Sequence, residues 1–156
     1  MGKLNEGDKA PDFDTISSDE KKVALRALKG KKVILYFYPK DDTPGCTVEA
    51  CGFRDKSGEI EAQGAVILGV SPDGVDSHKK FINKHSLPFT LLADEDKVIS
   101  KAYGVWVKKN KYGKEYMGVA RTTFVIDENG YIVKIYEKVK PEGHNDEIIA
   151  FLSGVS

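Results

Sequence analysis

Two short apolar runs separated by a helix-like stretch constrain the fold of this chain most strongly. The runs are Val33–Tyr38 and Ala65–Val70, and each is apolar at consecutive rather than alternate positions. Such a strand is typically buried on both faces, as in a parallel sheet covered by helices. Residues 47–62 between them carry apolar side chains at helical spacing and end before Gly64, a common helix terminator. A right-handed crossover then places the two strands side by side and parallel.

The rest of the pattern extends this unit into a mixed sheet with helices on both faces. Residues 13–16 and 22–25 flank a polar turn, which predicts a short N-terminal β-hairpin. Residues 122–127 and 131–136 flank an Asn-Gly pair, which is a strong hairpin signal. A short strand is expected at 89–92, and helices are expected at 75–85, 94–103 and 146–152. This order predicts the α/β class, with a central mixed β-sheet flanked by helices.

Composition and charge argue against several classes of function. Lys and Arg total 24, as do Asp and Glu, so the chain has no excess of positive charge for nucleic acid or an anionic membrane. No segment approaches the ~20 apolar residues that cross a bilayer. Residues 1–8 lack the apolar core of a secretory signal. The 156 residues fit one domain, 1–156, and we expect a cytoplasmic protein.

Two groups of charged residues are interpreted as having no role in chemistry. The run Lys108–Lys111 is short and is typical of a solvated loop. His78, His85 and His144 are scattered without the spacing of metal ligands, so we interpret all three as surface residues. No cofactor site and no metal site are predicted.

Chemistry is predicted where the first apolar run gives way to the helix. The segment Pro39–Cys46 reads PKDDTPGC, and Cys51 is the only other cysteine. A thiol at a helix N-terminus meets unpaired backbone N–H groups and the positive end of the dipole, which favour its thiolate. A second thiol nearby can form a disulfide once the first is oxidised. Because two cysteines are too few for a disulfide framework, the pair predicts redox chemistry at Cys46 with Cys51 as its resolving partner.

This segment resembles the active-site motif of peroxiredoxins. Pro39-x-x-x-Thr43-x-x-Cys46 matches that motif, and the string DTPGCTVEACGFRD over residues 42–55 is similar to the bacterioferritin comigratory protein, or peroxiredoxin Q, subfamily. Four other stretches agree in the same order, namely residues 7–13, 89–94, 103–106 and 121–127. The resemblance runs from about residue 4 to residue 152, which is nearly the whole chain.

The resemblance implies a thioredoxin-like fold and thiol-dependent reduction of hydrogen peroxide and organic hydroperoxides. In the implied cycle Cys46 becomes a sulfenic acid, and Cys51 resolves it as an intramolecular disulfide, the atypical two-cysteine scheme. The resemblance further implies recycling by thioredoxin or a related thiol reductant, a monomeric state and no cofactor.

The resemblance also implies roles for four residues around Cys46. Arg121 supplies a cation beside the thiolate, and Pro39 shields the thiolate from bulk water. Thr43 offers a hydroxyl that can hold a peroxide oxygen while hydrogen-bonding the sulfur, although it could instead simply cap the helix. Glu49 lies one helical turn after Cys46 and is expected to orient Arg121 by a charge-assisted hydrogen bond.

Three other functions are weighed against this one. A structural zinc module needs four ligands, and no second Cys/His pair accompanies the cysteines. A general thiol–disulfide oxidoreductase favours Cys-x-x-Cys, whereas four residues separate Cys46 from Cys51. A non-catalytic holdase chaperone leaves no signature in a sequence, so that alternative stays open.

Overall fold

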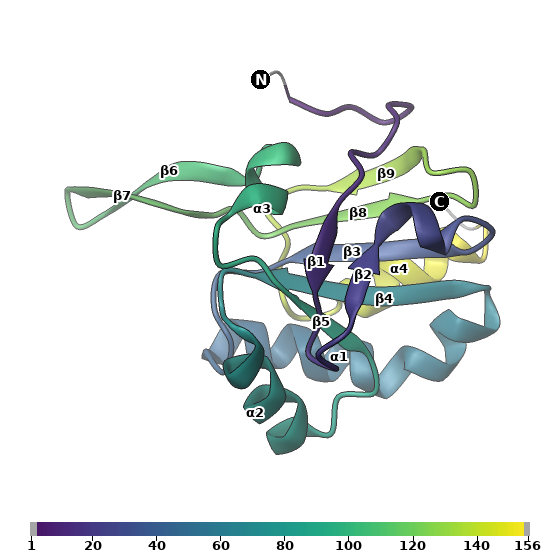
Figure 1. Ribbon diagram of the computed structural model, residues 1–156, viewed down its shortest axis with the longest axis horizontal. Helices are drawn as coiled ribbons and strands as arrows, with labels where there is room; N and C mark the ends of the chain where they lie inside the picture. Colours follow the sequence, from purple (N-terminus) through teal and green to yellow (C-terminus); the bar gives the residue numbers. More distant parts are fainter. Residues whose placement is uncertain (1–2, 155–156) are drawn as a thin grey trace.

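Strand β3 (Lys32–Phe37) lies at the centre of the molecule (Figure 1). The computed structural model describes residues 3–154 and contains a five-stranded sheet in the order β5-β4-β3-β8-β9. The other four strands are β4 (Ala65–Ser71), β5 (Thr90–Ala93), β8 (Thr122–Ile126) and β9 (Ile132–Tyr136). Strands β3, β4 and β5 are parallel, whereas β8 is antiparallel to both β3 and β9. The predicted mixed sheet and the predicted parallel pair are therefore confirmed.

The apolar side chains of β3 and the following Tyr38 belong to two hydrophobic cores, one on each face of the sheet. Because side chains alternate along a strand, Val33, Leu35 and Phe37 belong to one buried cluster. Ile34, Tyr36 and Tyr38 belong to the other. All six side chains are at most 1% exposed, which explains why this run shows no apolar–polar alternation.

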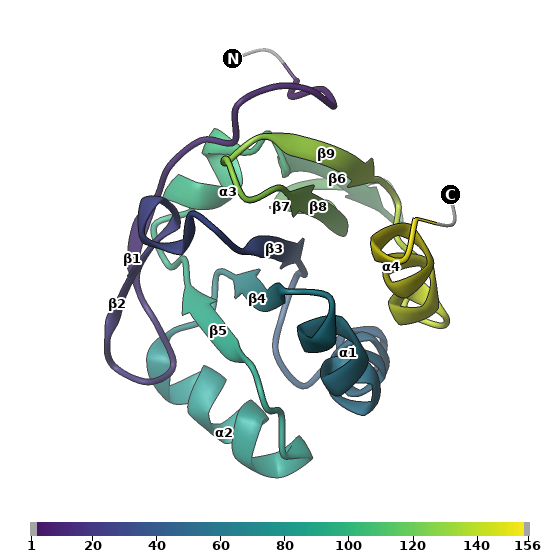
Figure 2. The same ribbon diagram turned by 90° about the vertical axis from the view of Figure 1, so that its right-hand side faces the viewer.

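Helices and a hairpin cover the two faces of the sheet (Figure 2). One core contains residues of α1 (Pro44–Ala62), α2 (Val75–His85) and α4 (His144–Leu152). The other core is covered by the N-terminal strands β1 (Asp14–Ile16) and β2 (Lys22–Ala24), the 3₁₀ helix η1 (Leu25–Leu28) and α3 (Val98–Ala102). The predicted N-terminal hairpin is confirmed by the antiparallel pairing of β1 with β2. No helix within residues 3–154 is long and apolar enough to cross a membrane.

Helix α3 is shorter than the sequence predicts. It begins at Val98 rather than Asp94, because Lys97 adopts a left-handed conformation with φ of 60°. The Asp94 carboxylate instead accepts hydrogen bonds from the backbone N–H groups of Ile99 and Ser100, at 3.0 and 2.9 Å. The acidic residue that was expected to open the helix therefore caps it from several residues upstream.

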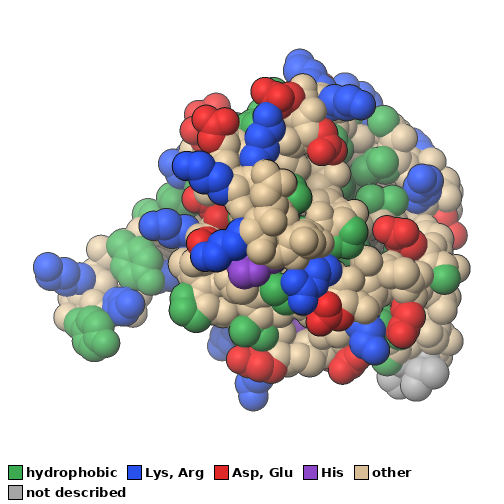
Figure 3. All heavy atoms as spheres, turned by 90° about the horizontal axis from the view of Figure 1, so that it is seen from below, with side chains coloured by type: hydrophobic (Ala, Val, Ile, Leu, Met, Phe, Trp, Pro, Cys, Tyr) green, Lys and Arg blue, Asp and Glu red, His purple; other side chains and the backbone are tan. Residues whose placement is uncertain are grey.

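The interpretation of residues 108–111 as a solvated loop is wrong. They belong to a β-hairpin of β6 (Trp106–Lys111) and β7 (Lys114–Val119), which projects from the body of the molecule as an arm (Figures 1 and 3). Only the base of the hairpin, at Trp106 and Val119, packs against the core, and most of its other side chains are exposed, so its strands lack the apolar alternation that identifies a strand. Its turn is Tyr112-Gly113, and the positive φ at both residues is that of a type I′ turn, but the Asn-Gly pair that usually signals such a turn is absent.

The interpretation of the histidines as surface residues is wrong for two of the three. His78 is 0% exposed and His144 is 1% exposed, and both have side-chain hydrogen-bond partners. His85 lies at the end of α2 and faces Asp42 on the surface, with 3.4 Å between Nε2 and Oδ1. A signal for His78 does exist in the sequence, because it precedes Phe81 and Ile82 at the three- and four-residue spacing of a buried helix face.

Gly69 in β4 leaves no room for a side chain between its neighbours on the two adjacent strands. A Cβ atom at this position would lie 2.7 Å from Leu91 Cδ2 and 2.9 Å from the Tyr36 hydroxyl. We expect Gly69→Ala to lower the free energy of unfolding by roughly 1–3 kcal/mol, because an overpacked core forces its neighbours to shift. The measurement is urea denaturation.

Gly58→Ala is the matched control for this substitution. Gly58 lies on the exposed side of α1, and a Cβ atom there meets nothing within 4 Å. Because alanine favours a helix over glycine, this variant should gain roughly 0.5–1 kcal/mol. A loss of stability in both variants would contradict the packing account of Gly69.

Candidate active site

Helix α1 begins with the residues that place Cys46 in its first turn. It starts at Pro44, three residues earlier than predicted, with Thr43 as the N-cap residue in extended conformation. Pro44 suits the first helical position because its ring fixes φ and it has no N–H to leave unpaired. Cys46 is therefore the third helical residue and is 1% exposed. The predicted position of the thiol at a helix N-terminus is confirmed.

The pairing of β8 with β3 brings Arg121 to this thiol. Phe37 at the end of β3 pairs with Thr122 at the start of β8, so the residue before Thr122 lies beside the loop that follows β3. Arg121 Nη2 donates a hydrogen bond to Cys46 Sγ at 3.1 Å. Its Nη1 donates to Glu49 Oε1 at 2.6 Å. One guanidinium thus contacts both the sulfur and a carboxylate, which are one helical turn apart.

Gly45 permits the close approach of the guanidinium to the helix. A Cβ atom at Gly45 would lie 3.3 Å from Arg121 Nη2 and 3.5 Å from Pro141 Cγ. The first contact would require the guanidinium to move by a few tenths of an ångström, whereas the second is ordinary van der Waals contact. The glycine before the cysteine therefore favours the observed position of Arg121, and its sequence neighbour Pro44 favours the helix start.

Burial governs the charges of this cluster. The side chain of Glu49 is 0% exposed, and burial raises the pKa of its carboxyl to about 7, although the charge of Arg121 and its hydrogen bond oppose that rise. Burial lowers the pKa of Arg121, but the neighbouring Glu49 and Cys46 outweigh this and raise it above its usual value. Within residues 3–154, Glu49 Oε2 has no hydrogen-bond partner. The expected contact of Glu49 with Arg121 is present.

The structure places Thr43 and Pro39 in the loop between β3 and α1. The Thr43 hydroxyl donates to the backbone carbonyl of Lys40 at 2.9 Å and makes no capping hydrogen bond to α1. The alternative that Thr43 serves as a side-chain cap is therefore wrong. Pro39 is half-buried directly after Tyr38, and its shielding of the thiol stays a prediction.

Cys51 lies in the same helix as Cys46 and is partly exposed. Both thiols are free. Behind them, the ring of Phe53 is fully buried, with its centroid 4.8 Å from that of Tyr36 and 5.6 Å from that of His144. The helix is therefore anchored to the sheet and to α4 immediately after Cys51.

A buried polar network that the sequence analysis missed lies beside the same loop. Asp41 Oδ2 and His78 Nδ1 are 2.7 Å apart, and the two side chains are 3% and 0% exposed. Tyr38 and Ser77 each donate a hydroxyl hydrogen bond to the Asp41 carboxylate, at 2.6 and 2.8 Å. This network connects the loop to α2.

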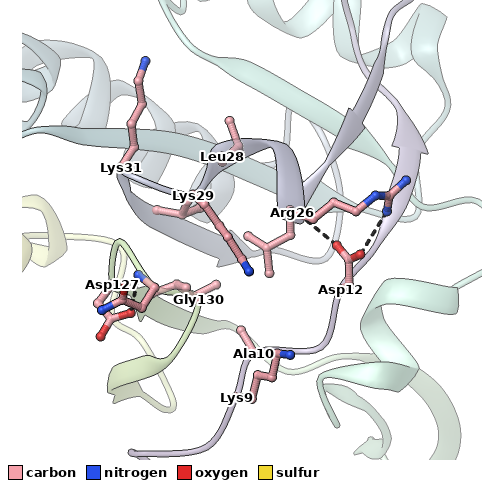
Figure 4. A pocket seen from close by; sticks show the side chains of 13 residues that line it. Lys9, Ala10, Asp12, Arg26, Leu28, Lys29, Lys31, Asp127 and Gly130 are labelled. Carbon is pink, nitrogen blue, oxygen red and sulfur yellow. Dashed lines mark hydrogen bonds and ion pairs between the residues drawn. The ribbon is translucent and has the colours of Figure 1, made fainter.

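The pocket shown in Figure 4 lies away from these residues. It is a hollow of about 110 Å³ near the first residues of β3, whereas Cys46 follows the last residues of that strand. Its lining includes Lys9, Ala10, Leu28 and Lys29 but none of the six predicted site residues. Within residues 3–154, no group of three or more His, Cys, Asp or Glu side chains is placed to hold a metal ion.

Comparisons with known proteins find consistent matches over nearly the whole chain. The sequence model of the AhpC/TSA family matches residues 6–135. A Bacillus subtilis protein named peroxiredoxin Bcp is 47% identical over 150 residues, which cover 96% of this chain and 96% of the relative.

Two solved structures have the same architecture. A mutant of PrxQ from Xylella fastidiosa matches with a TM-score of 0.93 and 32% identity, covering 99% of this chain and 98% of that one. The Xanthomonas campestris bacterioferritin comigratory protein, whose structures concern alkyl peroxide reduction, matches with a TM-score of 0.87 and 39% identity. That match covers 91% of this chain and 90% of that one.

The raised pKa of Glu49 gives a prediction about stability. Between the ordinary carboxyl pKa of 4.5 and the folded value of about 7, the folded protein binds more protons than the unfolded chain. The free energy of unfolding of the wild type therefore falls as pH rises through this window, by on the order of 3 kcal/mol at most. Glu49→Gln keeps an oxygen for Arg121 but has no titrating group, so its unfolding free energy should fall less. Urea denaturation of the reduced proteins at about pH 5 and about pH 8 measures the difference, and parallel pH profiles would contradict the burial of an ionisable Glu49.

Proposed function

Because the chain belongs to the AhpC/TSA family and is a peroxiredoxin of the Bcp/PrxQ type, we propose that its thiol peroxidase activity resides at Cys46. The thioredoxin-like fold inferred from the resemblance is confirmed by the matching solved structures. One observation carries the assignment of the reactive residue. Cys46 is a buried thiol in the first turn of a helix, and a guanidinium donates a hydrogen bond to its sulfur.

The proposed reaction is a nucleophilic substitution at oxygen. The Cys46 thiolate attacks one peroxide oxygen, the S–O bond forms, and the O–O bond breaks. The second oxygen leaves with the bonding electron pair and takes a proton, which gives water or an alcohol. Sulfur is oxidised by two electrons to the sulfenic acid, and the peroxide is reduced by two. Arg121 favours the thiolate before the attack, because a nearby cation stabilises the charged form.

Three neighbours support this step. The Thr43 hydroxyl donates to Lys40 O, so its oxygen lone pairs stay free to accept a hydrogen bond from the peroxide. Glu49 holds the guanidinium through its 2.6 Å contact and thereby fixes the direction of the Arg121 donor toward the sulfur. Pro39 contributes an apolar ring with no N–H at the end of β3, which suits a role in limiting access of water.

Cys51 is proposed to resolve the sulfenic acid after a local change of shape. Five residues along a continuous helix correspond to a rise of roughly 7.5 Å and a rotation of about 140°, so the two Cα atoms lie roughly 8.6 Å apart. A disulfide requires Cα atoms within ~7 Å. The first turns of α1 must therefore unwind before the two sulfurs can meet. Attack by the Cys51 thiolate on the Cys46 sulfur then forms the S–S bond and breaks the S–O bond, and the oxygen leaves as hydroxide, which takes a proton to become water.

The buried ring of Phe53 limits how far this unwinding extends. Phe53 packs against Tyr36 and His144, so unwinding beyond it would expose a large aromatic side chain to water. Arg54 Nη1 also donates to the His85 carbonyl at 2.8 Å, which ties the following turn to the end of α2. The segment that changes shape is therefore residues 44–52.

Reduction of the disulfide needs two electrons from an external dithiol. Thioredoxin or a related thiol reductant is the proposed donor, since its own thiols become the disulfide as Cys46 and Cys51 are released. We propose that the protein acts in the cytoplasm, where such reductants keep thiols reduced. We also propose that it is a monomer.

The division of labour between the two thiols can be tested by substitution. Cys46→Ser should abolish peroxide consumption, because the hydroxyl of serine is not ionised at neutral pH. Cys51→Ser should consume about one equivalent of peroxide and stop at the sulfenic acid, which mass spectrometry detects. Full thioredoxin-linked turnover in Cys51→Ser would contradict the resolving role, and activity in Cys46→Ser would remove Cys46 from the site.

The extent of unwinding can be tested by hydrogen exchange. In the disulfide form, amides of residues 46–52 should lose protection relative to the reduced protein, whereas those of residues 56–62 should keep it. Phe53→Leu is the informative variant, because a smaller side chain weakens the anchor and the loss of protection should spread further along α1. Equal protection of residues 46–52 in both redox forms would contradict the proposed change of shape.

A further inference from the structure

The Asp41–His78 network has a polar centre that is buried inside the protein, with side chains 3% and 0% exposed. His78 Nδ1 faces Asp41 Oδ2 at 2.7 Å, and His78 Nε2 faces the carbonyl oxygen of Leu92 at 2.9 Å. A backbone carbonyl can only accept a hydrogen bond, so Nε2 carries a proton. One further proton lies between Nδ1 and Oδ2. A carboxyl and an imidazole buried in this way are costly unless every polar atom is paired, and here both ring nitrogens and both carboxyl oxygens are paired.

We propose that Asp41 and His78 are positioning residues for peroxide reduction, which hold the loop of residues 39–43 in the geometry that Cys46 needs. This inference rests on the proposed function, because it assumes that Thr43 and Pro39 in that loop contact the peroxide or shield the thiol. Asp41 lies two residues before Thr43, and its carboxyl is hydrogen-bonded to Tyr38 and His78. It therefore acts through the loop rather than on the substrate.

The network is built at the carboxyl ends of three parallel strands. Tyr38 directly follows β3, Ser71 ends β4, and Leu92 lies in the last residues of β5. Ser71 donates to Asp73 Oδ2 at 2.7 Å, and the same oxygen accepts the Asp41 backbone N–H at 2.7 Å. Because the ends of these strands are fixed by the sheet, the loop is bonded to the most rigid part of the molecule.

The neighbouring residue Asp42 makes surface contacts, in contrast to the buried hydrogen bonds of Asp41. Asp42 points to the surface, where it pairs with Lys84 at 2.9 Å and with His85 at 3.4 Å. Exposed pairs of this kind contribute little to holding a structure in place. The buried bonds of Asp41 are therefore the contacts that fix the loop.

A fixed loop matters for the first chemical step in particular. A misplacement of about 1 Å in a reacting pair can slow a reaction about a hundredfold, because the orientation of the attacking atom is lost. Residues 44–52, by contrast, must unwind after oxidation, and the network ends before them at Asp41. Loss of the network should therefore slow the oxidation of Cys46 without slowing the formation of the disulfide.

The test measures oxidation alone, in a Cys51→Ser background that consumes a single equivalent of peroxide. In this background we expect Asp41→Asn to lower the second-order rate constant with hydrogen peroxide about tenfold or more. Arg121→Ala serves as the comparison, because it removes the donor that contacts Cys46 Sγ directly and should slow oxidation at least as strongly.

Two matched controls separate positioning from general loss of stability. Asp42→Asn makes the same substitution in the same loop at an exposed position, and it should leave the oxidation rate within about twofold of the parent. Tyr38→Phe is a second test variant: it keeps the buried ring, so it should fold, but it lacks the hydroxyl that donates to Asp41 and should slow oxidation severalfold. Its control is Tyr36→Phe. Tyr36→Phe removes a neighbouring buried hydroxyl that has no partner within residues 3–154, so it should not slow oxidation.

Disulfide formation in the two-cysteine proteins completes the test. With Cys51 present, Asp41→Asn and Tyr38→Phe should form the disulfide at the parental rate once oxidised. Oxidation rates of Asp41→Asn and Tyr38→Phe equal to those of their controls would overturn the inference. A parent protein that fails to consume peroxide would overturn the proposed function instead, so the two failures are distinguishable.

Discussion

The rest of the site depends on the contacts that the Arg121 guanidinium makes with Cys46 and Glu49. The guanidinium contacts the sulfur of Cys46 on one side and the carboxylate of Glu49 on the other, and all three groups are largely withdrawn from water. Without this cation, the site would contain a buried carboxyl with no partner beside a buried thiol, and neither could hold a charge at low cost. The arrangement is therefore a set of mutually dependent charges. The polar groups of Cys46, Glu49 and Arg121 can be buried between helix and sheet at low cost only because each contacts another member of this set.

The mixed order of the sheet makes this contact possible. The parallel strands β3 and β4 place the start of α1 at the carboxyl end of the sheet. The antiparallel strand β8 then enters at that same end, so that its first residues meet the helix rather than its last. If β8 ran parallel to β3, its first residue would lie at the opposite end of the strands, away from the start of α1. The direction of one strand thus decides whether Arg121 can reach Cys46 at all.

Residue patterns predicted most of the fold and the position of Cys46 at a helix start, and the failures have physical causes. The double-sided burial of β3 and β4 was readable because a short run of consecutive apolar residues is typical of a strand covered on both faces. The β6–β7 arm was missed because most of its side chains beyond its base are exposed, and the pattern that identifies a strand arises from burial. The spacing of His78 to Phe81 and Ile82 indicates a buried helix face, but it does not identify the polar partner that a buried histidine needs. Its partner Asp41 is 37 residues away, and only the packing of α2 against the sheet brings the two together.

The separation of Arg121 from Cys46 along the chain has a consequence for how the protein acquires its reactivity. The two residues are 75 positions apart, and the sheet pairing that joins them links positions up to 93 residues apart, from Val33 to Ile126. Contacts of such long sequence separation form only when most of the chain has collapsed, because loop closure is entropically costly. During synthesis, which proceeds from the N-terminus, Cys46 emerges well before Arg121 exists. The nascent polypeptide thus carries a thiol without its guanidinium partner, and this partner contact arises only after the last third of the chain has taken its place.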